Sequence, residues 1–157
     1  MKPKYLFLDI DAVLNDRDIM DQYMRKDPNV IVWRKHGLLE LAHTTFVGRL
    51  QDIIQQTNCT VVGISSWFSH PEDKDEIGMV LDIPISDVVD NTGGGSSRVR
   101  SVLRYLKSHE YESFVILDDI PNFTTDNVGL DDHHVQPIGS GLTEELANKA
   151  VRILGPT

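Results

Sequence analysis

Two aspartates stand two residues apart, directly after an apolar stretch near the start of the chain. The stretch Tyr5-Leu6-Phe7-Leu8 has the pattern of a buried strand, and Asp9-Ile10-Asp11 follows it. Two carboxylates this close concentrate negative charge, which costs free energy unless a cation or a reaction makes use of it. Asp-x-Asp pairs also occur in ordinary turns, so the pair alone does not decide between these interpretations.

A second pair of acids repeats the arrangement. Asp118 and Asp119 follow another apolar run, residues 114–117. If both runs are strands of one parallel sheet, the four carboxylates meet at one edge, where near pairs repel by about 4 kcal/mol at an effective dielectric of ~20. A divalent cation relieves this repulsion, and an all-oxygen ligand set favours Mg²⁺. We therefore expect Asp9, Asp11, Asp118 and Asp119 to surround one hard cation.

Hydroxyl groups and one arginine supply what a phosphate requires beside such a cation. Ser65 and Ser66 end the second apolar run, and their hydroxyl groups can donate to phosphate oxygens. Arg98 follows the glycine-rich stretch 91–97 and opens a helical pattern, so that its charge can reach over the strand ends. Two alternatives stay open: serines often simply end a strand, and Arg98 can be a solvated surface residue.

Zinc and cysteine chemistry are disfavoured by the residues present. No set of His and Cys has the spacing of a zinc site, and His133 and His134 are neighbours that face opposite sides of a strand. The one cysteine, Cys59, begins an apolar run and is interpreted as a buried thiol in a reducing compartment.

Strands and helices alternate along the chain, with the polar clusters at the ends of strands. Short runs rich in β-branched residues are typical of parallel strands buried on both faces. Thr143 followed by Glu144 and Glu145 marks the start of the last helix. The alternation predicts an α/β fold with a doubly wound, mainly parallel sheet, which binds ligands beyond the C-terminal ends of its strands. The predicted strands cover residues 5–8, 60–64, 85–89, 114–117 and 134–138, and helical stripes cover 46–54, 99–106 and 142–154.

Residues 16–42 interrupt this alternation. The segment is polar and mixed, and it contains Pro28 and a short β-like piece, residues 30–33. We interpret it as a flap, a small hairpin or cap insertion over the site. The length of 157 residues predicts one domain, residues 1–157.

The charge of the chain limits its partners. A formal net charge of -9 argues against non-specific binding to a nucleic-acid backbone, which requires an excess of Lys and Arg. A small phosphorylated molecule, or one nucleic-acid end met with the help of a divalent cation, stays open. The apolar stretch before Asp9 is too short for a signal peptide or a membrane span. We therefore expect a cytoplasmic protein (in the host cytoplasm if the chain is viral) without a membrane partner; no oligomeric state is indicated.

Four motifs stand in order at the predicted strand ends: Asp9 to Asn15, Ile64-Ser65-Ser66-Trp67, Arg98 before a helix, and Ile116-Leu117-Asp118-Asp119. In this order they resemble the motifs of the haloacid dehalogenase (HAD) superfamily. The chain is most similar to the nearly capless HAD domains of viral and bacterial Swiss-army-knife RNA-repair proteins. It is more distantly similar to the phosphatase half of polynucleotide kinase-phosphatase and to 5'(3')-deoxyribonucleotidases. The resemblance runs from about residue 4 to residue 154 and implies a three-layer, doubly wound Rossmannoid fold with five strands and a minimal cap.

The resemblance implies a catalytic role for four residues. Asp9 would be the nucleophile that forms an aspartyl-phosphate, which divides one difficult displacement into two easier ones. Asp11 would be the general acid for the leaving oxygen and then the general base for water. Ser65 would hydrogen-bond the transferring phosphoryl group, and Arg98 would stabilise its charge.

The resemblance also implies a metal and a substrate site. Mg²⁺ would bridge Asp9, the backbone carbonyl of Asp11, and a carboxylate of Asp118 or Asp119, with the choice between the last two left open. The substrate-binding residues would be Ser65, Ser66, Trp67 and Asn15. Trp33 or Trp67 can stack on a base, with a core position for either as the alternative.

Three positions depart from the family pattern. Position 12 is usually Gly and is Ala here, which adds a methyl group next to the metal loop. The basic residue of the third motif is more often Lys than Arg, and Arg is a poorer point charge but a better fork for phosphate. Close relatives often place Arg after Ser-Ser-Trp, where this chain has Phe68, so one substrate contact is absent.

Two hypotheses follow. The first is a Mg²⁺-dependent phosphohydrolase that cleaves a phosphomonoester of a nucleotide or of a nucleic-acid 3' or 5' end. The alternative is a HAD-fold protein that binds or sequesters a nucleotide without useful turnover. A receiver domain is disfavoured, because Asp87 and Asp90, which follow the third strand, lack a suitable Thr and Lys pair.

Overall fold

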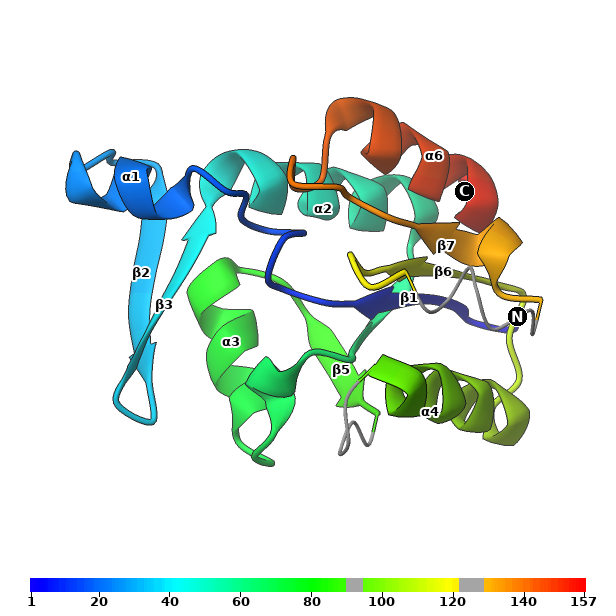
Figure 1. Ribbon diagram of the computed structural model, residues 1–157. Helices are drawn as coiled ribbons and strands as arrows, with labels where there is room; N and C mark the ends of the chain where they lie inside the picture. The colour runs from blue at the N-terminus through cyan, green and yellow to red at the C-terminus, as the bar shows by residue number, and fades with distance from the viewer. Residues whose placement is uncertain (90–94, 122–128) are drawn as a thin grey trace.

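A five-stranded parallel sheet forms the centre of the molecule. The structure is a computed structural model that describes residues 1–89, 95–121 and 129–157, with the backbone alone for 95–97. The strand order is β5-β4-β1-β6-β7, and each pairing is parallel (Figure 1). The predicted α/β fold with a mainly parallel sheet is confirmed. The strands are β1 (Lys4–Leu8), β4 (Thr60–Gly63), β5 (Ile85–Val88), β6 (Ser113–Leu117) and β7 (His134–Val135).

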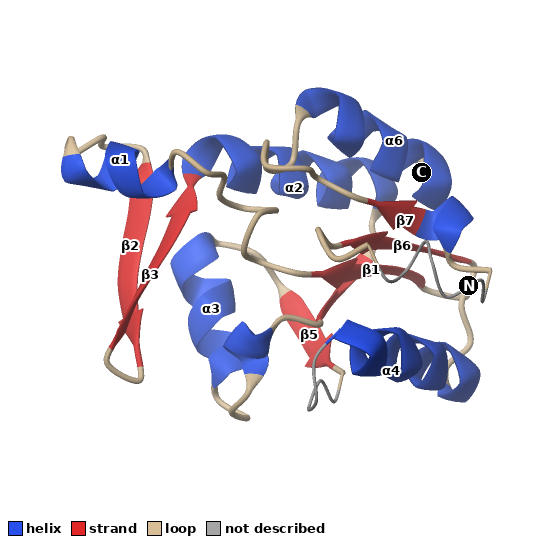
Figure 2. Ribbon diagram, in the orientation of Figure 1, coloured by secondary structure: helices blue, strands red, loops and turns tan. Residues whose placement is uncertain are grey.

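Helices cover both faces of the sheet and complete three layers (Figure 2). α2 and α6 lie over one face, α4 lies over the other, and α3 packs against β5. Within the described parts of the chain, none of the helices combines the length and the apolarity needed to cross a membrane. The helices are α2 (Thr44–Thr57), α3 (Asp73–Leu81), α4 (Gly95–Ser108) and α6 (Glu144–Leu154), with short 3-10 helices η1 (Ser66–Phe68) and η2 (Asp131–His133).

The central strand β1 is apolar because both of its faces are covered. Leu6, Phe7 and Leu8 are fully buried. Leu6 and Leu8 join the core with α2, α3 and α6, whereas Phe7 joins the core with α4, because successive side chains of a strand point to opposite faces. Polar chemistry is thereby confined to the loop that follows the strand.

The last helix begins where the sequence predicts. Thr143 is its N-cap, and its Oγ1 accepts a hydrogen bond from the N–H of Leu146 at 3.2 Å. Glu144 and Glu145 lie in the first turn, where negative charge is favourable next to the exposed N–H groups.

The segment between β1 and α2 contains a short helix and an antiparallel hairpin at one end of the molecule (Figure 1). These are α1 (Ile19–Met24), β2 (Val30–Lys35) and β3 (Leu38–His43), and the β-like piece 30–33 forms the start of β2. His36 and Gly37 at the hairpin tip have φ of 51° and 82°, as a tight two-residue turn requires. At the base, the N–H of His43 donates to the carbonyl of Leu14 at 2.9 Å.

Two predicted boundaries are wrong. The last strand was expected over 134–138 but ends at Val135, because its partner β6 ends at Leu117 and offers nothing further to pair; Ile138 is 79% exposed. The stretch 91–97 was expected to be a loop, but Gly95 already begins α4, so Arg98 lies within its first turn. Residues 91–94 and Asp90 lie outside the described residues. Cys59 is a buried free thiol, as predicted.

Candidate active site

The C-terminal ends of three neighbouring strands carry the predicted site. Asp9 follows β1, Asp118 follows β6, and Ser65 stands shortly after β4. The N–H of Asp9 donates to the carbonyl of Leu117 at 2.9 Å, so the ladder between β1 and β6 continues to the point where both acids emerge. Residues distant in the sequence therefore meet because parallel strands end at the same edge.

Three acids and one arginine form the centre of the site. Asp9, Asp118 and Asp119 each place a carboxylate oxygen within 4.8 Å of the others. Asp9 is 3% exposed and Asp118 is fully buried. Nη1 of Arg98 lies 3.1 Å from Oδ2 of Asp118 and 3.6 Å from Oδ2 of Asp9, so one guanidinium contacts both buried carboxylates. Arg98 thus reaches over the strand ends, as one of its two predicted positions requires.

Burial and mutual repulsion make these carboxylates poor anions in the absence of a further cation. Burial, followed by repulsion from Asp118, raises the pKa of Asp9 from 3.8 to about 8, even though Arg98 opposes the change. Burial likewise raises the pKa of Asp118 to about 6, against the N–H of Ile120 and the guanidinium of Arg98. The positive charge of Arg98 therefore does not offset the burial of this group of acids.

This donor set fits Mg²⁺. All three side chains offer carboxylate oxygens, the ligands that hard cations prefer, and a divalent charge would compensate the repulsion described above. The loop that carries Asp118 and Asp119 is held in place: Nε2 of His134 lies 2.7 Å from the carbonyl oxygen of Asp118, and Nε2 of Gln136 donates to the carbonyl of Asp119 at 3.1 Å.

Asp11 lies apart from this group, with its carboxylate held by two donors. Nδ2 of Asn15 donates to Oδ1 of Asp11 at 3.1 Å, and Nε1 of Trp67 donates to Oδ2 at 3.0 Å. Asp11 is exposed, whereas Asp9 and Asp118 are buried. The carboxylate of Asp11 is therefore not among the three clustered acids that could hold a metal ion.

Asn15 has structural partners on three sides. Besides Asp11, its Nδ2 donates to the carbonyl of Leu41 in β3 at 2.8 Å, and its Oδ1 accepts from the N–H of Ala12 at 2.7 Å. The side chain is buried. Asn15 thus closes the loop after β1 and joins it to the hairpin, a role that its predicted function in substrate binding did not include.

The two tryptophans lie in the core. Trp33 and Trp67 are 9% and 4% exposed, and their rings meet edge to face with centroids 5.0 Å apart. Of the two roles that the sequence left open, the contacts are those of core side chains, because neither ring offers a face to solvent for stacking on a base. Trp67 nevertheless reaches the site through its indole N–H.

A cavity of about 560 Å³ lies at the end of β4, and Ser65 and Ser66 lie in its wall. Oγ of Ser65 accepts from the N–H of Trp67 at 3.2 Å and caps η1, so its own O–H can be donated to a ligand. Lys74 of α3 also lines this cavity. The sequence analysis missed Lys74, because it stands in a run of charged residues with no pattern to single it out.

Phe68 packs against Gly63 and also lines the cavity that contains Ser65 and Ser66. A Cβ on Gly63 would lie 2.6 Å from two ring carbons of Phe68, so the ring fills the space that the glycine leaves. Phe68 is 6% exposed. The arginine contact expected at this position in relatives is absent here, and Lys74 brings a positive charge to the same cavity.

Ala12 adopts a backbone conformation that glycine would adopt more readily. Its φ is 64°, in the left-handed region that disfavours a Cβ. This geometry gives a physical reason for the usual glycine at this position. The methyl group therefore imposes a conformational cost at the turn that follows Asp9.

A comparison with protein families identifies the relationship that these features suggest. The family model described as the HAD domain in Swiss Army Knife RNA repair proteins matches residues 5–147. The chain belongs to this family. The comparisons with curated proteins and with solved structures gave no match. The matched range includes all four strand-end motifs, so the predicted membership of the HAD superfamily is confirmed.

Family membership supports a HAD-type phosphohydrolase in general. HAD proteins generally use Mg²⁺, and the cluster of Asp9, Asp118 and Asp119 offers a suitable set of ligands.

Proposed function

We propose that the protein is a Mg²⁺-dependent phosphohydrolase that cleaves a phosphomonoester of a nucleotide or of a nucleic-acid end. The observation that carries the proposal is the pair of buried acids, Asp9 and Asp118, bridged by Arg98 at the strand ends. Ser65, which stands shortly after the neighbouring strand β4, lines a cavity with hydroxyl and ammonium donors. Buried acids with raised pKa values in a cleft are typical of functional sites.

The two aspartates after β1 divide the reaction between them. A carboxylate oxygen of Asp9 attacks phosphorus, the bond from phosphorus to the leaving oxygen breaks, and Asp11 gives that oxygen a proton. In the second half, Asp11 takes a proton from water as the water oxygen attacks phosphorus, and the carboxylate of Asp9 is released with inorganic phosphate. The exposed position of Asp11 and the burial of Asp9 suit these different tasks.

Charge stabilisation falls to the groups around Asp9. Mg²⁺ held by Asp9 with Asp118 or Asp119, and by the carbonyl of Asp11, would neutralise charge on the phosphoryl oxygens and on the attacking carboxylate. Arg98 contacts both Asp9 and Asp118 and therefore stands where the equatorial phosphoryl oxygens gain negative charge. The O–H of Ser65 would hydrogen-bond another of these oxygens.

The remainder of the substrate would occupy the cavity beside Ser66. Lys74 in its wall offers a cation for a second negative group, which favours a nucleotide or an oligonucleotide end over an uncharged alcohol ester. The net charge of -9 is consistent with recognition of one end rather than of an extended backbone.

One feature favours the alternative of a nucleotide-binding protein with little turnover. Both oxygens of Asp11 already accept a hydrogen bond, so a proton that Asp11 carries must occupy the remaining lone pair of an oxygen held by Trp67 or Asn15. The strained turn at Ala12 lies beside it. A binding protein would retain the cavity and the metal ligands and would lose only this step.

The test is a phosphatase screen over nucleoside monophosphates and oligonucleotides with 3' or 5' phosphates, in Mg²⁺ and in EDTA. Asp9→Asn is the inactive variant, and Asp52→Asn on the exposed surface of α2 is the matched control. We expect Mg²⁺-dependent phosphate release by the wild type and by Asp52→Asn alone. Tight nucleotide binding without release in all three proteins would replace the proposal with the alternative.

A further inference from the structure

A group of two histidines and one aspartate joins the hairpin tip to the start of α3. His36 lies at the tip between β2 and β3, His70 lies between η1 and α3, and Asp73 is the first residue of α3. The three residues each place a possible ligand atom within 4.8 Å of the others. They lie on other elements than the acids at the strand ends and form a second, separate cluster.

Asp73 is the buried centre of this cluster. Its side chain is fully buried, and the backbone N–H of His70 donates to its Oδ2 at 2.8 Å. Nε2 of His36 lies 3.2 Å from its Oδ1, and Nδ1 of His70 lies 3.5 Å from its Oδ2. Burial would raise the pKa of Asp73, but these donors and the nearby Lys35 outweigh it and leave the pKa lowered. The carboxylate is thus an oriented anion.

The imidazoles stand side by side over this carboxylate and remain open to solvent. Their ring centroids are 3.9 Å apart with the planes tilted by 34°, and the side chains of His36 and His70 are 41% and 52% exposed. The cluster therefore offers three ligand atoms, namely two ring nitrogens and one oxygen of the buried carboxylate. Because the rings are exposed, an ion and a water molecule can approach from the solvent side. Small rotations of the exposed rings would bring both nitrogens to one ion.

We propose that His36, His70 and Asp73 form a second metal site, for Zn²⁺ or a similar divalent transition-metal ion, which clamps the hairpin tip to α3. Imidazole and carboxylate are ligands that Zn²⁺ accepts with a water in the fourth position. Mg²⁺ prefers an all-oxygen set, so the two clusters select different ions. This site does not depend on the proposed reaction.

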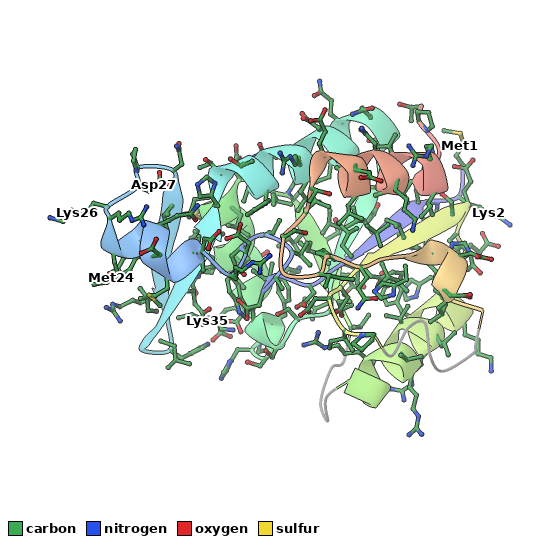
Figure 3. All side chains as sticks on the ribbon, turned by 45° about the horizontal axis from the view of Figure 1, so that its top comes forward. Met1, Lys2, Met24, Lys26, Asp27 and Lys35 are labelled. Atoms are coloured by element: carbon green, nitrogen blue, oxygen red, sulfur yellow. The ribbon has the colours of Figure 1, made fainter. Side chains whose placement is uncertain are left out.

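The charge next to the site sets a limit on affinity. Lys35, which is labelled in Figure 3, is the last residue of β2. Its ammonium lies 3.5 Å from Oδ2 of Asp73 and also donates to the carbonyl of Trp67. It occupies one side of the carboxylate and leaves Oδ1, which faces His36, for the ion. Because this positive charge opposes a cation, we expect weaker binding than at a closed structural zinc site, with the acidic net charge as partial compensation.

A bound ion would have a structural consequence for the substrate cavity. His70 lines the same cavity as Ser65 and Ser66. An ion shared with His36 would fix this wall to the hairpin and would stabilise the folded protein by mass action.

The test uses Co²⁺ as a spectroscopic probe and Zn²⁺ as the titrant. The proteins are the wild type, His36→Ala, His70→Ala and, as matched control, His109→Ala at the exposed end of α4. We expect a visible Co²⁺ absorption band and calorimetric Zn²⁺ binding in the wild type and in His109→Ala. Loss of the band and Zn²⁺ affinity weaker by more than about 100-fold are expected in the other two variants.

A second background separates this site from the catalytic acids. Asp9→Asn should keep the Co²⁺ band and the rise in Tm with Zn²⁺, because Asp9 belongs to the other cluster. The histidine variants should keep the far-ultraviolet circular dichroism of the wild type, since both rings are exposed. The proposal is overturned if the wild type shows no band, if His36→Ala binds Zn²⁺ like the wild type, or if Asp9→Asn abolishes the band.

Discussion

Replacement of Asp9 by asparagine is expected to stabilise the metal-free protein while it removes the proposed nucleophile. Burial, and then repulsion by Asp118, raise the pKa of Asp9 from 3.8 to about 8 in the folded protein. Between these two pH values the folded protein retains a proton that the unfolded chain has released. The stability of the metal-free wild type therefore falls as the pH rises through this window. The stability of Asp9→Asn does not fall for this reason, because asparagine does not ionise.

The magnitude follows from the difference in pKa. At pH 7 the carboxyl of Asp9 lowers the free energy of unfolding by about 4 kcal/mol relative to a group with an unchanged pKa. Part of this gain is lost in the variant, because a buried amide also needs partners, at about 1–3 kcal/mol. We therefore expect Asp9→Asn to be more stable than the wild type by about 1–3 kcal/mol at pH 7. The difference should grow by about 1.4 kcal/mol per pH unit between pH 5 and 7.

The assay is urea unfolding in EDTA, followed by the fluorescence of the buried Trp33 and Trp67 at pH 5, 6, 7 and 8. Asp52→Asn, at an exposed position, should follow the wild type at every pH. Saturating Mg²⁺ should stabilise the wild type and not Asp9→Asn, because the ion binds the folded state through this carboxylate. A stability difference between Asp9→Asn and the wild type that is the same at pH 5 and pH 7 would refute the reasoning.

Three further substitutions test other parts of the site. Arg98→Ala should lower the turnover number at least about 100-fold with a smaller change in KM, because its charge matters most in the transition state; an unchanged turnover number in steady-state kinetics would exclude this role. Gly63→Ala should lower the free energy of unfolding by about 1–3 kcal/mol, because its Cβ would overlap the ring of Phe68. A urea midpoint of Gly63→Ala equal to that of the wild type would contradict this packing. Ala12→Gly should raise the stability by about 1 kcal/mol, because φ of 64° disfavours a Cβ; a lower urea midpoint would show that the turn is not strained.

The sheet was predictable because its strands are buried on both faces. Leu6, Phe7 and Leu8 must be apolar to contact a core on either side, and such a run is visible in the sequence. The short helices α1 and α3 have no comparable apolar pattern in the sequence. α1 buries none of its residues, and the buried positions of α3 are limited to Asp73, Ile77 and Leu81, too few for a clear stripe.

The site was predictable to the extent that it depends on strand ends. The structure brings together Asp9, Asp118 and Arg98, whose positions follow from the parallel sheet. The contact from Trp67 to Asp11 spans 56 residues of sequence and depends on how η1 packs, which no local pattern encodes. The cluster of His36 and His70 could not be predicted for the same reason. The two histidines are too far apart in the sequence to match the spacing of a zinc motif, and their rings meet only because the hairpin tip packs against the start of α3.

The hairpin contacts the site at both of its ends, and this bears on what the insertion does. At its base, the carbonyl of Leu41 accepts from Asn15, the same amide that holds Oδ1 of Asp11. At its tip, Lys35 holds the carbonyl of Trp67, whose indole N–H holds Oδ2 of Asp11. Each oxygen of the proposed general acid is therefore oriented by a residue that the hairpin itself positions. Because β2 and β3 are paired along their full length, we expect a shift of the tip to be passed along the strands to one of these donors. The insertion is for this reason a support for Asp11, and an ion at the proposed site on the hairpin tip would act on the proposed proton transfer through Trp67.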